Sequence, residues 1–257
     1  MRIAWLPLLL GIILFTACGD PGDGVLWGHS DRALSVDAIE VTTVSGAAYR
    51  FDWSFTMLPD AALRILEHPN ERPVYTNQSG RFTFHDVPVD EPTTFVLEAP
   101  DFFPTQTATL LPGKDGIGDV AFQVPPTALT WAMSLLLFEV IDPDKCQIAS
   151  TVTEPGGNPW SQGIEGAQVF IDPPLPPDRG PFYFMIVEIP GWPIIDLPLR
   201  WLTETTGDGG VIFINVPPGD YVISAEKDGE EFTSAYLKCR PGVLVNAAPP
   251  YGLQRID

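Results

Sequence analysis

The sequence predicts an all-β protein with two tandem β-sandwich domains that follow an N-terminal export signal. Three observations lead to this fold class. The chain contains 28 prolines and 23 glycines among 257 residues, a density that excludes long helices and suits short strands joined by turns. One pattern of alternating apolar residues occurs twice along the chain. The hydrophobic fraction of 45% is that of a folded chain rather than a disordered one.

The first 17 residues have the layout of a cleaved export signal. Arg2 supplies a positive charge, residues 3–15 form a short apolar run, and two small residues precede Cys18. A membrane-spanning helix needs about 20 apolar residues, so this run is too short to cross a bilayer. Phe15-Thr16-Ala17-Cys18 resembles the lipobox of bacterial lipoproteins, and an ordinary signal peptide is the alternative.

The resemblance to bacterial lipoproteins implies that Cys18 is lipidated. Members of that family carry a diacylglyceryl thioether, usually with a third acyl chain such as palmitate, and two or more chains anchor a protein stably. Residues 18–32, rich in Gly and Asp, predict a flexible tether. We therefore expect a lipid anchor in the cell membrane or the outer membrane, with the chain facing the periplasm or the cell surface. In the enteric members of the family that this segment resembles, Asp directly after the lipidated cysteine retains the protein in the inner membrane. The resemblance therefore implies that Gly19, at this position, favours the outer membrane.

The chain is strongly acidic. It has 33 acidic and 14 basic residues, which give a formal net charge of −19. The field of such a chain repels phosphate groups, so nucleic acid is not an expected partner. The acidic residues are spread along the sequence and predict a soluble surface.

Two segments share one pattern: TNQSGRFTFHDVP at residues 76–88 and TTGDGGVIFINVP at residues 205–217. In each, a turn dipeptide that contains Gly precedes alternating residues, which predict a strand with one side facing a core. Val-Pro ends the strand because Pro cannot donate to a ladder. Further strands are predicted at residues 62–66 and 95–99 in the first copy, and at residues 167–171 and 221–225 in the second.

These residues resemble the carboxypeptidase regulatory-like domain, which is also described as transthyretin-like or prealbumin-like. The second copy carries its signature well, in Gly166-Ala167-Gln168-Val169 and in Val216-Pro217-Pro218-Gly219-Asp220-Tyr221. The first copy diverges, because it lacks the P-G-x-Y turn. The resemblance implies two transthyretin-like β-sandwiches, at residues 33–126 and 127–257. It implies little about function, because this sandwich occurs in many unrelated proteins.

The second domain contains both cysteines that remain if Cys18 is lipidated. Residues 146–153 predict its first strand, and Cys239 follows its last predicted hairpin. An oxidising compartment favours a disulfide between Cys146 and Cys239, which would join the first strand to the last; two separate thiols are the alternative. Before them, residues 129–140 predict a buried segment, and periodicity does not separate helix from strand.

Residues 173–200 are an insertion that the first copy lacks, rich in proline and aromatic residues. Insertions on a rigid sandwich often carry binding sites. One interpretation is an exposed aromatic patch that contacts an envelope protein or a glycan, made of Phe182, Tyr183, Phe184, Trp192 and Trp201. The alternative is an extra hairpin, with residues 182–189 as one strand packed on its own domain.

The sequence predicts no catalytic, cofactor-binding or metal-binding site. Its three histidines, His29, His68 and His85, lack the spacing of metal ligands, and there is no G-x-S-x-G motif. Residues 206–210 predict a plain hairpin turn, and residues 142–144 a solvated turn.

The function expected from the sequence is that of a non-catalytic, membrane-anchored lipoprotein with a binding, adhesion or scaffold role. One alternative is a carbohydrate-binding accessory lipoprotein that uses the aromatic insertion. The other is an enzyme on a prealbumin-like sandwich, which histidines or carboxylates converging in one pocket would favour.

Overall fold

The structure is a computed structural model that describes residues 39–52, 54, 56–187 and 195–256, all within one compact unit. The signal segment 1–17, Cys18, the tether at 18–32 and Trp192 lie outside the described residues, so what the sequence predicts for them stays a prediction. Within the described part of the chain, no helix is long and apolar enough to span a membrane.

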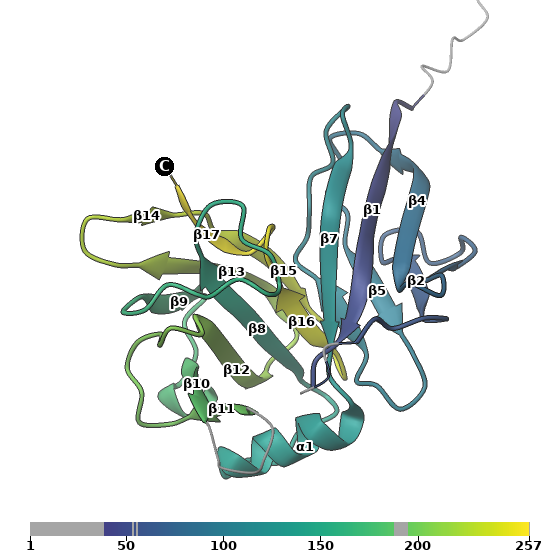
Figure 1. Cartoon of the computed structure of the whole chain (residues 1–257). Helices are drawn as coiled ribbons and strands as arrows, with labels where there is room; N and C mark the ends of the chain where they lie inside the picture. Colours follow the sequence, from purple (N-terminus) through teal and green to yellow (C-terminus); the bar gives the residue numbers. More distant parts are fainter. Residues whose placement is uncertain (1–38, 53, 55, 188–194, 257) are drawn as a thin grey trace, which may run out of the picture. The chain divides into compact units, whose positions relative to one another are not determined.

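The described residues form mostly β-structure with one short α-helix (Figure 1). The elements before the helix are β1 (Val41–Arg50), β2 (Ala62–Ile65), β3 (Val74–Tyr75), β4 (Arg81–Pro88), β5 (Phe95–Glu98), β6 (Thr105–Thr107) and β7 (Ile117–Val124). The helix and the elements after it are α1 (Thr127–Leu136), β8 (Cys146–Thr153), β9 (Gln168–Asp172), a 3-10 turn (Pro177–Arg179), β10 (Phe182–Val187), β11 (Ile195–Leu199), β12 (Gly210–Val216), β13 (Gly219–Glu226), β14 (Glu231–Phe232), β15 (Ala235–Cys239), β16 (Leu244–Ala247) and β17 (Leu253–Ile256).

The strands before and after α1 repeat one arrangement. β1 pairs antiparallel with β4 and parallel with β7, just as β8 pairs antiparallel with β12 and parallel with β16. β5 lies between β2 and β6, just as β13 lies between β9 and β15. These sheets are consistent with a β-sandwich fold class. β6 also pairs in parallel with β16, so strands of both halves share one sheet. The predicted domain boundary at residue 126 stays a prediction.

One buried threonine in each half makes the same hydrogen bonds. Its hydroxyl accepts from a backbone N–H and donates to a carbonyl: Thr76 with Ala61 and Leu58 (2.9 and 2.7 Å), and Thr205 with Ala167 and Ile164 (2.9 and 2.6 Å). These bonds match Ala167 with Ala61. The strands predicted at residues 62–66 and 167–171 would instead match Ala167 with Ala62, which is wrong by one residue. The residues that precede these two alanines, Asp60 (φ 56°) and Gly166 (φ 79°), both have a positive φ. The backbone conformation is therefore also equivalent at this position in the two halves.

Removing either buried hydroxyl is expected to destabilise the fold. Thr205→Val leaves the Ala167 N–H and the Ile164 carbonyl without the partner they share, and should lower the free energy of unfolding by about 2–4 kcal/mol. Thr76→Val should cost a similar amount. Thr203→Val, at an exposed position, is the control in urea denaturation. Losses below about 0.5 kcal/mol for both buried variants would contradict this role.

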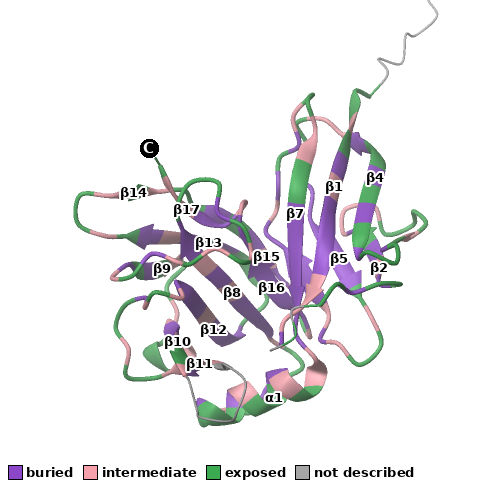
Figure 2. Ribbon diagram, viewed as in Figure 1, coloured by how far each residue is buried: buried purple, intermediate pink, exposed green. Residues whose placement is uncertain are grey.

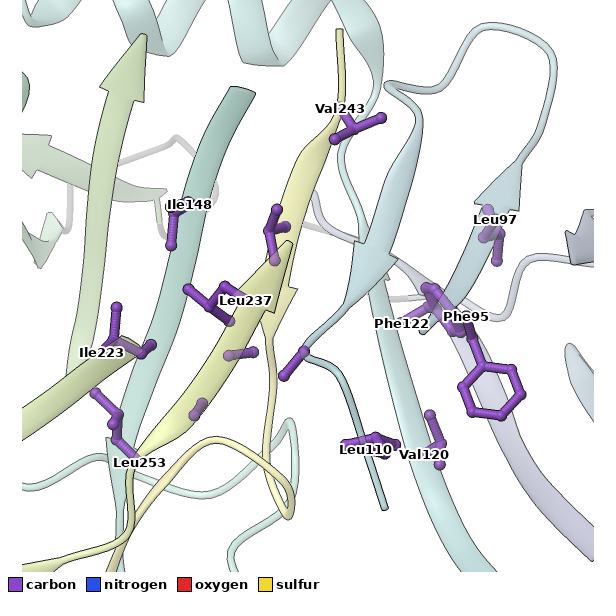
Figure 3. Packing of buried hydrophobic residues seen from close by; sticks show 14 of the residues in the cluster. Phe95, Leu97, Leu110, Val120, Phe122, Ile148, Ile223, Leu237, Val243 and Leu253 are labelled. Atoms are coloured by element: carbon purple, nitrogen blue, oxygen red, sulfur yellow. The ribbon is translucent and has the colours of Figure 1, made fainter. Parts of the chain in front are cut away.

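A single cluster of buried hydrophobic side chains takes in strands of both halves. Phe95 and Phe122 come from the first half and Ile148, Ile223 and Leu237 from the second (Figure 3), and each is almost fully buried. Because side chains alternate along a strand, β4 buries its core side and exposes the other, which gives its banded colouring in Figure 2.

Cys146, at the start of β8, and Cys239, at the end of β15, form a disulfide with a Cα–Cα distance of 5.6 Å. The predicted pairing is therefore confirmed. The expectation that it joins the first strand of the domain to the last is wrong. Two strands follow Cys239, and the first of them, β16, enters the sheet beside β8.

The segment 129–140 is a helix over most of its length, and the expectation that it is buried is wrong. α1 turns Thr130 and Ser134 inward, and their hydroxyls donate to backbone carbonyls of the helix region. Its apolar side chains Trp131, Leu135 and Leu136 are exposed. Only one side of the helix packs on the sheets, so apolar composition alone does not bury the segment.

Candidate ligand-binding cavity

A cavity of about 300 Å³ lies on the outer face of β12, β8 and β16. Alternation along β8 sends Ile148 into the core and leaves Ala149 on the opposite face. The strand register pairs Ile212 with Ala149 and Ala149 with Asn246. These last three residues form one row across the floor of the cavity.

Several other parts of the chain wall the cavity. They include α1 and the residue after it, the β10–β11 hairpin, the turn before β12, the end of β7 with the residue after it, and further segments: Thr130, Met133, Ser134 and Leu137; Phe184, Ile186, Asp196 and Pro198; Gly207 and Asp208; Gln123 and Pro125; and Phe51, Ile141, residues 158–162 and Pro249. Leu137 is fully buried against Phe182 and Ile214, which fixes the C-terminal end of α1 over the sheet.

Aromatic rings form part of the wall. Phe51 meets Phe184 edge to face, with ring centroids 6.5 Å apart. Trp160 stands in the same relation to Tyr49 at 5.0 Å and is half exposed. Edge-to-face pairs hold their rings in defined orientations. The aromatic rings that line the cavity are therefore held in place before any ligand binds.

Two polar atoms at the cavity have no hydrogen-bond partner among the described residues. Gln147 is 1% exposed, and its Oε1 accepts from the Asn215 N–H at 2.9 Å. That bond fixes the amide and leaves Nε2 buried without an acceptor. Asp196 Oδ1 is likewise unpartnered. Unmet polar groups are costly and uncommon in native structures, so both atoms point to a missing occupant.

The carboxylates of the cavity titrate away from their ordinary range. Burial and the charge of Asp196 raise the pKa of Asp208 to about 6, although the Gly210 N–H donates to Asp208 Oδ2 at 3.0 Å. Burial also raises the pKa of Asp196. No Lys, Arg or His lines the described part of the cavity, so no basic side chain of the lining balances these two acids.

Of the two interpretations of the aromatic insertion, the exposed patch does not hold for its first three aromatic residues. Phe182, Tyr183 and Phe184 are 3%, 2% and 6% exposed, because β10 pairs with β12 and with β11 and so extends the sheet as a hairpin. The alternative of a packed hairpin holds for these residues. Phe184 lines the cavity, and Trp201 is 72% exposed.

The sequence reasoning missed Gln147, Asp196 and Asp208 as candidate site residues. Asp208 was placed only in a hairpin turn, which is confirmed by the positive φ of Gly209 (74°) and by the Gly209 N–H donating to the Thr206 carbonyl. Alternation with the core residues Cys146 and Ile148 predicts only that Gln147 faces away from the core, and nothing in the sequence marks it as a site residue. The described residues hold no group of three or more potential metal-ligating side chains.

No family model matches the sequence, and no curated protein matches it. Solved structures with weak similarity include the TIE protein of Bacillus anthracis, at 8% identity and TM-score 0.25 over 84% of this chain and 34% of that one. A streptococcal ancillary pilin has 10% identity and a TM-score of 0.24, over 86% of this chain and 63% of that one. A minor pilin of Streptococcus agalactiae has 11% identity and a TM-score of 0.24, over 84% of this chain and 96% of that one. This chain thus spans a third of the first and less than two thirds of the second. Similarity this weak carries no argument about function.

Proposed function

We propose that this protein is a non-catalytic, lipid-anchored protein of the cell envelope that binds a small ligand in the cavity over β12, β8 and β16. The observation that carries the proposal is Gln147, a fully buried amide at the cavity whose Nε2 has no acceptor in the described part of the chain. Two transthyretin-like sandwiches form the body of the protein, and the equivalent bonds of Thr76 and Thr205 support that repeat.

The cavity has the properties of a small-molecule site. Ligand pockets enclose about 300–1,000 Å³ and have mainly apolar walls with a few well-placed polar groups. This cavity lies at the lower end of that range, with Ile212 and Phe184 among its apolar walls. A molecule the size of one sugar unit or one aromatic amine fits such a volume.

Filling the cavity is expected to abolish binding. Ala149→Phe places a ring in the middle of the floor, and Ala132→Phe makes the same change on the exposed side of α1. Binding is measured by ligand-observed NMR on protein purified from membranes of cells that express the full chain, against a library of sugars and small amphipathic molecules. Ala149→Phe should lower affinity at least about tenfold, and Ala132→Phe should leave it unchanged. The site is wrong if no compound binds, or if both variants bind like the wild type.

A glycan is one class of ligand that specific observations favour. Trp160 and Phe184 offer ring faces or edges, and the amides of Gln147 and Asn246 can bond hydroxyl groups. The sugars in the library test this form of the proposal, which gives a carbohydrate-binding accessory protein.

The acid pair is the specific observation that favours an enzyme as the second candidate. Two carboxylates converge in one cavity, and Asp208, with a pKa of about 6, could donate a proton near neutral pH. Turnover of a glycoside or ester panel that Asp208→Asn abolishes would establish the enzyme. Binding without turnover would leave the binding function in place.

Lipidation of Cys18 is expected from the Phe-Thr-Ala-Cys junction. Cys18→Ser should release the protein from the membrane fraction or leave the signal uncut, because the acyl chains are attached to that sulfur. Fractionation and intact mass of the exported protein measure both outcomes. A variant that fractionates and migrates like the wild type would overturn the anchor.

A further inference from the structure

We infer that the cavity takes a ligand with a protonated amine attached to an apolar or aromatic body, and that the amine lies at Asp196 and Asp208. This inference rests on the proposed binding function and specifies the class of ligand. It concerns an organic cation, recognised by charge at one end of the molecule and by apolar contact along the rest.

The cavity contains two acidic side chains, Asp196 and Asp208, and no basic side chain among the described residues. Among the residues that the structure describes, Asp196 Oδ1 has no partner, and the hydrogen bond found for Asp208 comes from the Gly210 backbone. Partly buried carboxylates without a counter-charge are unfavourable. An ammonium group brings the missing charge and up to three donors, in hydrogen bonds that are stronger than neutral ones.

An aromatic ring, that of Phe184, lies beside these two acids. In the β10–β11 hairpin Ile186 pairs with Asp196 and Phe184 with Pro198, so Phe184 and Asp196 share one face. A Cβ added to Gly210 would meet both Asp208 Oδ2 and the Phe184 side chain. Ring and carboxylates therefore surround one space. Aromatic faces attract organic cations in addition to making apolar contact.

A metal ion fits this space less well. Divalent cations such as calcium need six or more oxygen ligands, and the described residues hold no group of three potential metal-ligating side chains. The apolar walls provided by Ile212, Leu137 and Phe184 would contribute nothing to such an ion. The unpartnered Gln147 Nε2 requires an acceptor, which an oxygen on an organic ligand would supply.

The test compares two probes that differ only in the charged group, 2-phenylethylamine and 2-phenylethanol. Affinities are measured by calorimetry or NMR titration at pH 7.5 on protein from membranes of cells that express the full chain. The amine should bind at least about tenfold more tightly than the alcohol. Asp196→Asn should remove that preference, so that the amine and the alcohol bind with similar affinity. Asp228→Asn, which removes the same charge from an exposed turn, should leave the preference intact.

Each other outcome overturns the inference in a recognisable way. If the alcohol binds as tightly as the amine and Ala149→Phe blocks both, the cationic ligand is wrong and the binding function stands. If calcium displaces the amine in simple competition and binds more tightly, the site is a metal site. If no compound of the amine, alcohol or sugar classes binds at millimolar concentration, the binding function fails as well. If Asp196→Asn lowers the melting temperature, the same affinities are measured on Asp208→Asn instead. A preference for the amine that is unchanged in Asp208→Asn also contradicts the inference.

Discussion

Replacing both Cys146 and Cys239 by alanine should lower the free energy of unfolding by about 4–5 kcal/mol. The cysteines are 93 residues apart in sequence, and in the chain-entropy model a cross-link closing a loop of that length removes this much conformational freedom from the unfolded state. The loss is a large part of the total stability of a typical domain. Guanidinium denaturation followed by fluorescence measures it.

The wild type in excess reductant is the control for this prediction. Reduction breaks the same bond without changing a side chain, so its midpoint should approach that of the double variant. A loss of less than about 1 kcal/mol in both experiments would show that the disulfide constrains little, against the expectation of the chain-entropy model.

Asp208→Asn should raise the free energy of unfolding at pH 8 by about 1–3 kcal/mol. The pKa of Asp208 rises from 3.8 to about 6 on folding, so the folded state binds its proton more tightly than the unfolded state. The stability contributed by this group is therefore complete below about pH 4 and is lost as the pH rises to about 6. A difference of about two in the pKa between the folded and unfolded states corresponds to about 3 kcal/mol of stability, and the partial exposure of Asp208 reduces this free energy. Asparagine keeps an acceptor for the Gly210 N–H and carries no charge.

The pH dependence separates this effect from a general gain in packing. The advantage of Asp208→Asn should shrink toward zero at pH 4, where the wild-type carboxyl is protonated. Asp228→Asn, at an exposed position, should change stability little at either pH. A variant that is less stable than the wild type at pH 8, or equally stabilised at both pH values, would show that Asp208 is not held in an unfavourable charged state.

The repeated strands could be predicted from the sequence because each carries its own periodic signal. The turns at Gly80 and Gly209 both have positive φ (67° and 74°), and Asp86 and Asn215, matched in the alignment, share it as well (60° and 50°). Asp60 stands where the second copy has Gly166. Because no glycine marks this turn in the first copy, the match predicted for the strands at residues 62–66 and 167–171 is wrong by one residue. The pairing of β6 with β16 joins segments far apart in the chain, and no local pattern encodes it.

The cavity could not be predicted in the same way. Its walls include Phe51, α1, residues 158–162, the β10–β11 hairpin and the turn that holds Asp208, and only the fold brings them together. The concentration of aromatic residues in the insertion is visible in the sequence, but the pairing of β10 with β12 decides their burial. In the sequence, Gln147 and Asp196 look like ordinary surface residues. Only the structure shows that each has a buried polar atom without a partner among the described residues.

The location of a bound ligand tests the binding site most directly. A crystal structure of the protein with the tightest compound from the library should show it over the row formed by Ile212, Ala149 and Asn246, with an acceptor atom within hydrogen-bond distance of Gln147 Nε2. Binding of that compound at any other surface, with the cavity holding only water, would contradict the assignment of this face as the functional site.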